Sequence, residues 1–189
     1  VPSLMLPGGA ASAEKPNILF IAIDDQNDWF GCLGGHPQAQ TPNIDRLAAA
    51  GTRFDCASTN CPICIPARAS LATGQYVHRI GYWDNGQPYD GRVESWHHVL
   101  RAAGHRVDSI GKLHFRGGDD NGFTEEIEPL HVVDKIGDVL GCIRDDAPRR
   151  HKRSGIDEAG PGDSTYIRYD AANGERARAW LARHARDSR

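Results

Sequence analysis

The sequence has no apolar run long enough to cross a membrane, which excludes a membrane-spanning helix. It also lacks a charge bias, because 22 Lys and Arg residues stand against 25 Asp and Glu residues for a net charge of −3. We therefore expect no nucleic-acid partner, and any anion-binding site must be local. With 39% hydrophobic residues among 189, the chain can bury the core of one globular domain.

Cysteine is too sparse for a disulfide-stabilised scaffold. The five cysteines are Cys32, Cys56, Cys61, Cys64 and Cys142. Their odd number leaves at least one thiol free unless it pairs between chains.

Residues 1–15 lack the charged start of an export signal, but a short apolar piece in them leads to small residues that end in Ala-Ser-Ala, residues 11–13, as signal cleavage sites do. We interpret them as a terminal arm or a signal-peptide remnant, and place the folded part in residues 16–189. This interpretation favours a periplasmic or secreted location over a cytoplasmic one.

Apolar runs and glycine stops alternate along the chain. The run PNILFIAIDD, residues 16–25, predicts a strand buried on both faces of a parallel sheet. The next stretch predicts a helix with Thr41 as N-cap, Pro42 at its first position and Gly51 as its stop. Residues 52–58, TRFDCAS, then predict a second strand.

The same order recurs further on. Residues 94–104 predict a helix that stops at Gly104, and residues 105–111 predict a strand. A last helix is expected over about Ala171–Arg186. Helix, glycine and strand in repeated succession indicate an α/β fold with a mostly parallel sheet flanked by helices.

Polar residues follow two of the predicted strands, at the sheet edge where ligands bind in open parallel sheets. Asp24 and Asp25 suit a hard cation such as Ca²⁺ or Mg²⁺, or else Asp25 only caps a turn. Lys112 and His114, two apart on an extended chain, predict an anion-binding and proton-transfer pair, with a solvated basic loop as the alternative.

The stretch CPICIPARASLATG, residues 61–74, places Cys64 close to the start of a predicted helix, because Pro66 suits a first turn. The N–H groups and dipole there favour a thiolate or another anion. Arg68, one turn on, adds positive charge to the same face.

Other readings of these cysteines are open on the residues alone. Cys61 and Cys64 match a C-P-x-C redox pair, and together with Cys56 and a histidine they could bind zinc. Cys64 could also be a buried structural cysteine. His78 and Asn85 lie beyond the predicted helix, and each alone is more often a structural hydrogen-bonding residue.

Taken together, these stretches resemble the sulfatase family of the alkaline-phosphatase-like superfamily. Residues 64–68 fit its C-x-P-x-R motif, and the supporting blocks PNILFIAIDD, TPNIDRLAAAGTRF, TGQYVHRIG and GKLHFRG occur in the family's order. The tract YWDNGQPYDG is similar to the choline-sulfatase branch, whereas DDQNDWFGCLGGHPQAQTPNIDRL is similar to iduronate-sulfatase-like enzymes.

The resemblance implies the N-terminal part of an alkaline-phosphatase-like sulfatase fold. It implies that a formylglycine-generating enzyme converts Cys64 to Cα-formylglycine (3-oxoalanine). Asp24 and Asp25 would bind a divalent cation beside Cys64, usually Ca²⁺, with Mg²⁺ and Mn²⁺ as alternatives. The hydrated aldehyde would attack the sulfur of a sulfate monoester, carried by a small molecule or a saccharide.

The resemblance also implies roles for the other residues. Arg68 would hold the modified residue, and Lys112 and His114 would contact the sulfate and the nucleophile. Asn85 would contact the substrate or the nucleophile, and His78 would contact the substrate. Family members are longer and bring further metal ligands from later sequence, so an inactive fragment is one alternative. A phosphonate or phosphate ester hydrolase of the same superfamily is another, and the sequence does not predict an oligomeric state.

Overall fold

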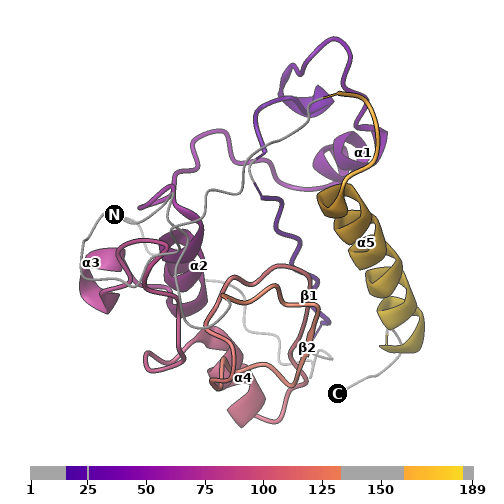
Figure 1. The fold of residues 1–189 in the computed structure, drawn as a ribbon. Coiled ribbons are helices and arrows are strands. Elements are labelled where there is room, and N and C mark those ends of the chain that lie inside the picture. Colours follow the sequence, from indigo (N-terminus) through magenta and orange to yellow (C-terminus); the bar gives the residue numbers. More distant parts are fainter. Residues whose placement is uncertain (1–15, 25, 133–159, 185–189) are drawn as a thin grey trace, which may run out of the picture. The chain divides into compact units, whose positions relative to one another are not determined.

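The structure is a computed structural model that describes residues 16–24, 26–132 and 160–184 (Figure 1). The chain divides into two compact units, Val1–Ser58 and Thr59–Arg189, which are described separately. The predicted arm over residues 1–15, Asp25 and Cys142 lie outside the described residues. Within the described residues, no helix combines the length and the apolar character needed to cross a membrane.

The first unit contains a short 3-10 helix, η1 (Gly31–Leu33), and the helix α1 (Pro42–Ala50). The predicted start of α1 is confirmed, with proline in the first turn and Thr41 at the N-cap position. The Thr41 hydroxyl does not cap α1. It accepts a hydrogen bond from the Gly31 N–H at 2.9 Å and donates one to Asp45 at 3.1 Å, which ties η1 to α1.

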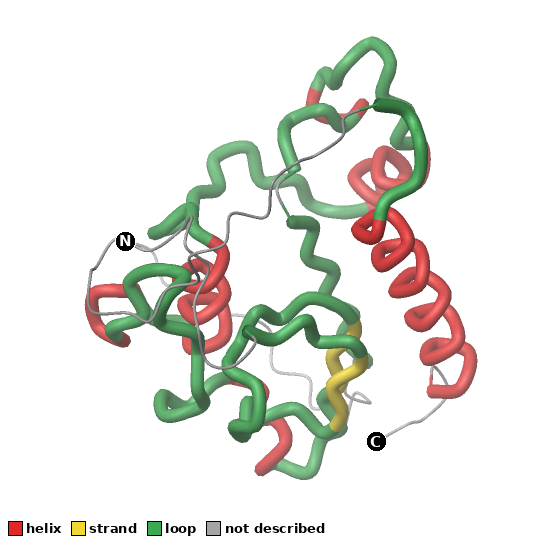
Figure 2. The backbone as a smooth tube through the Cα atoms, viewed as in Figure 1, coloured by secondary structure: helices red, strands yellow, loops and turns green. Residues whose placement is uncertain are grey.

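The two strands predicted in this unit are wrong for the described residues. Residues 16–24 and 52–58 belong to no strand, and Figure 2 draws both as loop. Ile18 is 85% exposed and Ile21 is 67% exposed, so the apolar run is not buried. Apolar pattern identifies a segment that could enter a sheet, but a strand also needs a partner backbone to complete its hydrogen bonds.

The second unit holds the remaining helices and strands. In chain order they are α2 (Cys64–Thr73), α3 (Val77–Ile80), α4 (Trp96–Ala102), β1 (Asp108–Ile110), β2 (Glu125–Ile127) and α5 (Thr165–His184). The expected helices at α2, α4 and α5 are confirmed, although α5 starts six residues earlier than predicted. The strand expected within residues 105–111 is confirmed as β1.

β1 and β2 pair in parallel, with Ser109 opposite Glu126. The two segments stay side by side beyond the strands, because the Leu113 N–H donates to the Pro129 carbonyl at 2.6 Å and Arg116 bridges to Val132. Parallel pairing combined with helices is the arrangement that the sequence predicts.

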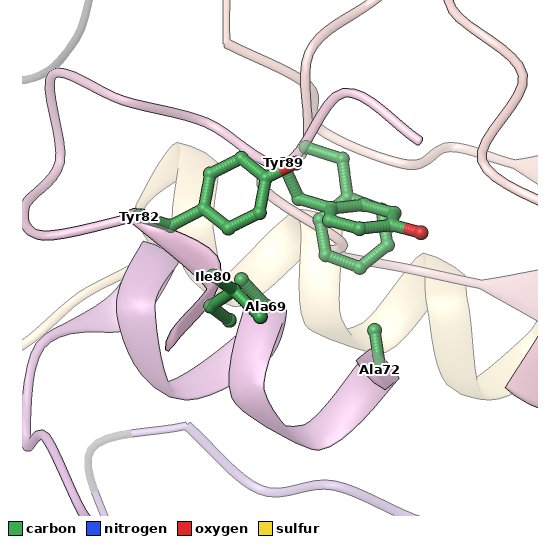
Figure 3. Packing of buried hydrophobic residues seen from close by; sticks show 6 residues of the cluster. Ala69, Ala72, Ile80, Tyr82 and Tyr89 are labelled. Carbon is green, nitrogen blue, oxygen red and sulfur yellow. The ribbon is translucent and has the colours of Figure 1, made fainter. Parts of the chain in front are cut away.

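The core of this unit lies where α2 meets the loops that follow it. The buried cluster joins Ala69 and Ala72 of α2 to Ile80, Tyr82, Tyr89 and Phe115 (Figure 3). The Tyr89 ring lies 4.8 Å from the Phe115 ring and 5.5 Å from the Tyr82 ring, centroid to centroid. Since aromatic rings at these distances add favourable contacts to their buried area, they fix the segment after β1 against α2.

The helix α5 is fixed to the two strands by polar contacts. The Trp180 indole N–H donates to the Asp108 carboxylate at 2.7 Å, and the Arg176 guanidinium pairs with Glu128 at 3.0 Å. The Tyr169 hydroxyl also donates to the Glu128 carbonyl at 2.6 Å. The helix α5 is therefore held against the start of β1 and the residue that follows β2.

Candidate active site

Cys64 is the first residue of α2, as the sequence predicts, and its thiol is free and partly buried. Ile65 and Ala69 are fully buried, so this side of α2 faces the core. Gly74 ends the helix in a left-handed conformation, φ 65°, and its N–H donates to the Ser70 carbonyl. The helix is thus defined at both ends, and Cys64 stands at its N-terminus.

Arg68 links α2 to the segment after β1. Its guanidinium donates to the Lys112 backbone carbonyl at 2.6 Å, although the two residues are 44 apart in the sequence. Arg68 follows Cys64 by one helical turn, and residues four apart lie on the same helix face. The structure therefore brings the backbone of Lys112 to the face of α2 that carries Cys64.

His114 has an unusual backbone conformation, with φ 58° in the left-handed region. The sequence predicted that Lys112 and His114 point to the same side because side chains alternate along an extended chain. The left-handed backbone at His114 interrupts that alternation. His114 lies between Leu113, which packs against the core, and Phe115, which belongs to it. Non-glycine residues seldom adopt this conformation, although histidine does so more often than most, and functional sites are common places for it.

Asn85 lies at the start of α2. Its side-chain Oδ1 accepts a hydrogen bond from the Ile65 backbone N–H at 3.0 Å, and the residue is only 6% exposed. The neighbouring Asp84, which the sequence did not single out as a site residue, is fully buried. Its carboxylate accepts from the Gly86 N–H at 2.8 Å, as expected of an aspartate in a tight turn.

The remaining predicted site residues are His78, Asp24 and Asp25. His78 is on the short helix α3, where its exposed ring stacks on Tyr76 with centroids 5.6 Å apart. Asp24 is exposed and belongs to the first unit, and Asp25 lies outside the described residues. No group of three potential Cys, His, Asp or Glu metal ligands occurs within residues 16–24, 26–132 and 160–184.

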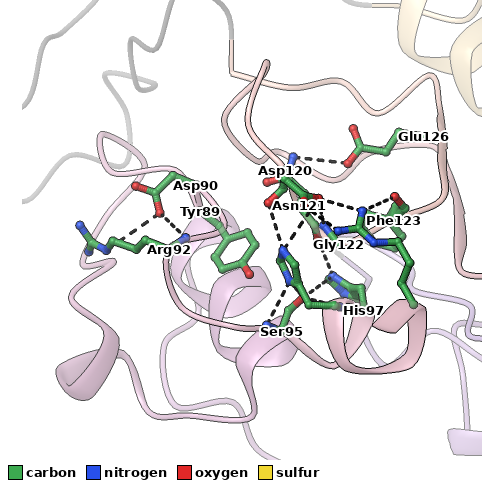
Figure 4. Close-up of polar contacts among 12 residues, drawn as sticks. Tyr89, Asp90, Arg92, Ser95, His97, Asp120, Asn121, Gly122, Phe123 and Glu126 are labelled. Carbon is green, nitrogen blue, oxygen red and sulfur yellow. Dashed lines mark hydrogen bonds and ion pairs between the residues drawn. The ribbon is translucent and has the colours of Figure 1, made fainter. Parts of the chain in front are cut away.

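A buried polar network near α4 was not predicted from the sequence (Figure 4). Ser95 caps α4 in a reciprocal arrangement with His98, and Ser95 Oγ lies 2.9 Å from Nδ1 of His97. Nδ1 of His97 also lies 3.0 Å from the Asn121 carbonyl. The sequence signal was the Ser-x-x-His spacing at the start of an expected helix, which resembles a capping box with histidine in the place of glutamate.

Two charged residues next to this network, Arg101 and Asp120, are joined by hydrogen bonds. Arg101 donates to both oxygens of Asp120, at 2.8 and 2.6 Å. These bonds, with a further one from the Gly122 N–H, lower the pKa of Asp120 to about 2. Burial lowers the pKa of His97 to about 4, so this imidazole is neutral at neutral pH. The network therefore holds the loop around residue 121 against α4.

Comparison with known proteins places the chain in a family. A family model described as Sulfatase matches residues 16–187. The chain therefore belongs to the sulfatase family, as its motifs predict.

Several kinds of sulfatase are similar in sequence to this chain. The uncharacterized sulfatase YidJ of Escherichia coli is 40% identical, over 59% of this chain and 22% of its own length. Choline-sulfatase of Rhizobium meliloti is 38% identical, over 60% and 22%, and arylsulfatase A of Bos taurus is 37% identical, over 68% and 27%. Such similar identities do not select a branch, and the chain spans about a quarter of the length of the curated relatives it matches.

A solved structure supports the fold. BT4656 in complex with its substrate, D-glucosamine-2-N,6-O-disulfate, has a TM-score of 0.55 and is 35% identical, covering 59% of this chain and 22% of that one. This likeness confirms the α/β fold class that the sequence predicts.

Proposed function

We propose that the protein hydrolyses a sulfate monoester through a Cα-formylglycine formed from Cys64. Membership of the sulfatase family supports sulfate-ester hydrolysis in general. The observation that carries the finer proposal is the position of Cys64 at the first residue of α2, inside the C-x-P-x-R motif. The sulfated saccharide bound by BT4656 supports a small-molecule or saccharide sulfate ester as the substrate class.

The surroundings of Cys64 fit a polar, modified side chain. Its thiol is free and only partly buried, and it stands where backbone N–H groups and the helix dipole favour negative charge. A hydrated formylglycine would supply a hydroxyl nucleophile toward the sulfur of the ester. The conversion of Cys64 by a formylglycine-generating enzyme is part of the proposal.

The two positive side chains near Cys64 would have separate roles. Arg68 lies one turn from Cys64 and is anchored on the Lys112 carbonyl, so the cationic side chains of Arg68 and Lys112 both start close to α2. Arg68 would hold the modified residue, and Lys112 would contact the sulfate, where a fixed cation stabilises the charge that develops on the oxygens during hydrolysis. His114, two residues after Lys112, would hold or donate the proton that the leaving alcohol needs.

The resemblance assigns metal binding to Asp24, Asp25 and Cys64. Asp24 is exposed in the first unit, and the described part of the chain contains no cluster of three potential ligands. These described residues alone do not fit a complete metal site. Binding of Ca²⁺, Mg²⁺ or Mn²⁺ by Asp24, Asp25 and Cys64 stays a prediction, as do the contacts of His78 with substrate and a periplasmic or secreted location.

Peptide mass spectrometry over Cys64, after co-expression with a formylglycine-generating enzyme, tests the proposal. Conversion of the thiol to the aldehyde lowers the peptide mass by roughly 18 Da, as follows from the chemistry of the nucleophile. We expect that loss at Cys64, together with turnover of an aryl sulfate by the full-length protein. Replacing Cys64 with Ala should lower that turnover by about four orders of magnitude or more, because it removes the nucleophile.

Cys61→Ala is the matched control, because Cys61 is also free and partly buried but lies outside the motif. This variant should keep both the mass loss and the turnover. A Cys64 thiol that stays unmodified while a control peptide is converted would contradict the proposal. Faster turnover of a phosphate diester than of an aryl sulfate would replace it with the phosphate-ester alternative.

A further inference from the structure

The helix that carries Cys64 begins without a cap of its own. The residue at its N-cap position is Ile63, which has no polar side chain and makes no side-chain cap hydrogen bond. The first N–H groups of an α-helix have no partner within the helix, and polar N-cap side chains usually supply one. For a core-facing helix such as α2, this function must come from elsewhere in the chain.

Asn85 supplies the missing acceptor from 20 residues further along the chain. Its Oδ1 accepts from the N–H of Ile65, the second residue of α2, at 3.0 Å. A polar side chain at an N-cap accepts from the second or third N–H of its helix, so Asn85 makes the bond that Ile63 cannot make. Ile65 is fully buried and Asn85 is 6% exposed, so water has little access to replace it.

The turn around Asn85 is itself held by hydrogen bonds. The fully buried Asp84 accepts from the Gly86 N–H with its carboxylate at 2.8 Å, and from the Gln87 N–H with its carbonyl at 3.1 Å. The Gln87 side chain in turn accepts from the Trp83 N–H at 3.1 Å. Residues 83–87 therefore form a braced turn that presents Asn85 to the start of α2.

We propose that Asn85 is a positioning residue for Cys64, acting through the first turn of α2. This inference rests on the proposed function, because it concerns the nucleophile of that reaction. Ile65 directly follows Cys64, so the hydrogen bond that fixes the Ile65 N–H also fixes the direction in which the Cys64 side chain leaves the helix. Small displacements of a reacting group reduce rates strongly, by about 10²-fold for 1 Å.

A positioning role and a substrate contact predict different kinetics. If Asn85 acts through α2, its loss lowers kcat while KM stays nearly constant, because the nucleophile is misplaced and the sulfate is still bound. If the Asn85 amide mainly binds the ground-state ester, its loss raises KM while kcat is kept. The acceptor and donor parts of the amide can also be separated, since Asn85→Asp keeps an oxygen for the Ile65 N–H but removes the amide donor.

The experiment compares the parent protein with Asn85→Ala, Asn85→Asp and a control, each as full-length protein. Ser164→Ala is the matched control, because the Ser164 hydroxyl accepts from the Ile167 N–H at 3.1 Å at the exposed start of α5. Amide hydrogen exchange is measured at Ile65 before maturation, and kcat and KM for an aryl sulfate are measured after it.

We expect Asn85→Ala to speed exchange at Ile65 at least tenfold and to lower kcat at least tenfold, with KM within threefold of the parent. Asn85→Asp should restore most of the protection and most of kcat, and Ser164→Ala should leave both at the parental value. Unchanged exchange at Ile65 in Asn85→Ala would overturn the proposal, as would a raised KM with kcat intact.

The exchange measurement separates this inference from the proposed function. A parent protein with an unmodified Cys64 and no sulfatase turnover would refute the proposed function, while exchange at Ile65 would still show whether Asn85 caps α2. If Asn85→Asp does not fold beside the buried Asp84, the comparison of Asn85→Ala with the parent alone decides the outcome.

Discussion

His97 is a titratable side chain enclosed by aromatic rings. It is only 3% exposed, its ring stacks on Phe123 with centroids 4.1 Å apart, and Trp96 lies edge-on at 4.2 Å. The Asn121 carbonyl can only accept a hydrogen bond, so Nδ1 of His97 carries a proton and donates to it. Since burial disfavours the charged form, protonation of this residue opposes folding.

The pH dependence of stability follows from that burial. The pKa of His97 is about 4 in the folded protein and 6.5 in the reference state, so the unfolded chain binds the proton more tightly. Well above pH 6.5 His97 does not lower the free energy of unfolding. As the pH falls from 6.5 to 4, its protonation in the unfolded chain lowers that free energy progressively. At pH 4.5 this reduction reaches about 2.5 kcal/mol of unfolding free energy. Urea unfolding at pH 7.5 and pH 4.5 measures it.

The control is His97→Gln, which cannot titrate in this range. We expect this variant to be less stable at pH 7.5 but to lose about 2.5 kcal/mol less than the parent on acidification. Equal losses in the two proteins would show that other groups account for the acid sensitivity.

At the scale of elements, a loop glycine can be required because the backbone of another segment lies too close for a side chain. Gly91 has φ 77°, and a Cβ at this position would lie well inside van der Waals contact with the Asp120 carbonyl. Gly104, which follows α4, has a similar φ of 84° but has no atom within 4 Å of such a Cβ. Alanine substitutions at the two positions therefore distinguish the effect of steric overlap from that of backbone strain.

We therefore expect Gly91→Ala and Gly104→Ala to differ in stability. Gly104→Ala adds only the cost of a left-handed alanine, about 1 kcal/mol. Gly91→Ala adds displacement of the segment around residue 120, for a total on the order of 3 kcal/mol. Urea midpoints at pH 7.5 provide the comparison, and equal shifts in the two variants would contradict the close approach.

Elements could be predicted from the sequence where their signals are local. The starts of α1 and α2 follow from Pro42 and Pro66, and the end of α2 follows from Gly74, because these residues act within one turn. The bond from Asn85 to Ile65 could not be predicted, since it joins residues 20 apart through a turn with no cap signal of its own. The left-handed His114 could not be predicted either, because no local signal such as a glycine marks that position.

At the scale of the whole molecule, an exposed apolar segment favours association between chains. Ile18, Phe20 and Ile21 are 85%, 58% and 67% exposed, and they lie within a few residues of one another outside any strand. Contiguous exposed apolar residues of high β-propensity promote association between chains. We therefore expect the 189-residue chain to associate in a concentration-dependent manner.

Replacing Ile21 with Lys should suppress that association, because a charge interrupts the apolar run. Leu47→Lys is the control, since Leu47 is 68% exposed but stands on α1 away from this run in the sequence. Sedimentation velocity over a hundredfold range of concentration measures the effect. Equal suppression by both variants would point to net charge rather than to the segment.

The hydrogen bond from Arg68 to the Lys112 carbonyl also sets when this part of the fold can form during protein synthesis. It spans 44 residues, so it cannot form until the ribosome has made that length of chain after Arg68. At 5–20 residues per second, this delay is roughly 2 to 9 seconds. Cys64 and Arg68 leave the ribosome ahead of Lys112 by about the same interval, so we expect the proposed modification of Cys64 to be able to take place on the nascent chain before this contact forms.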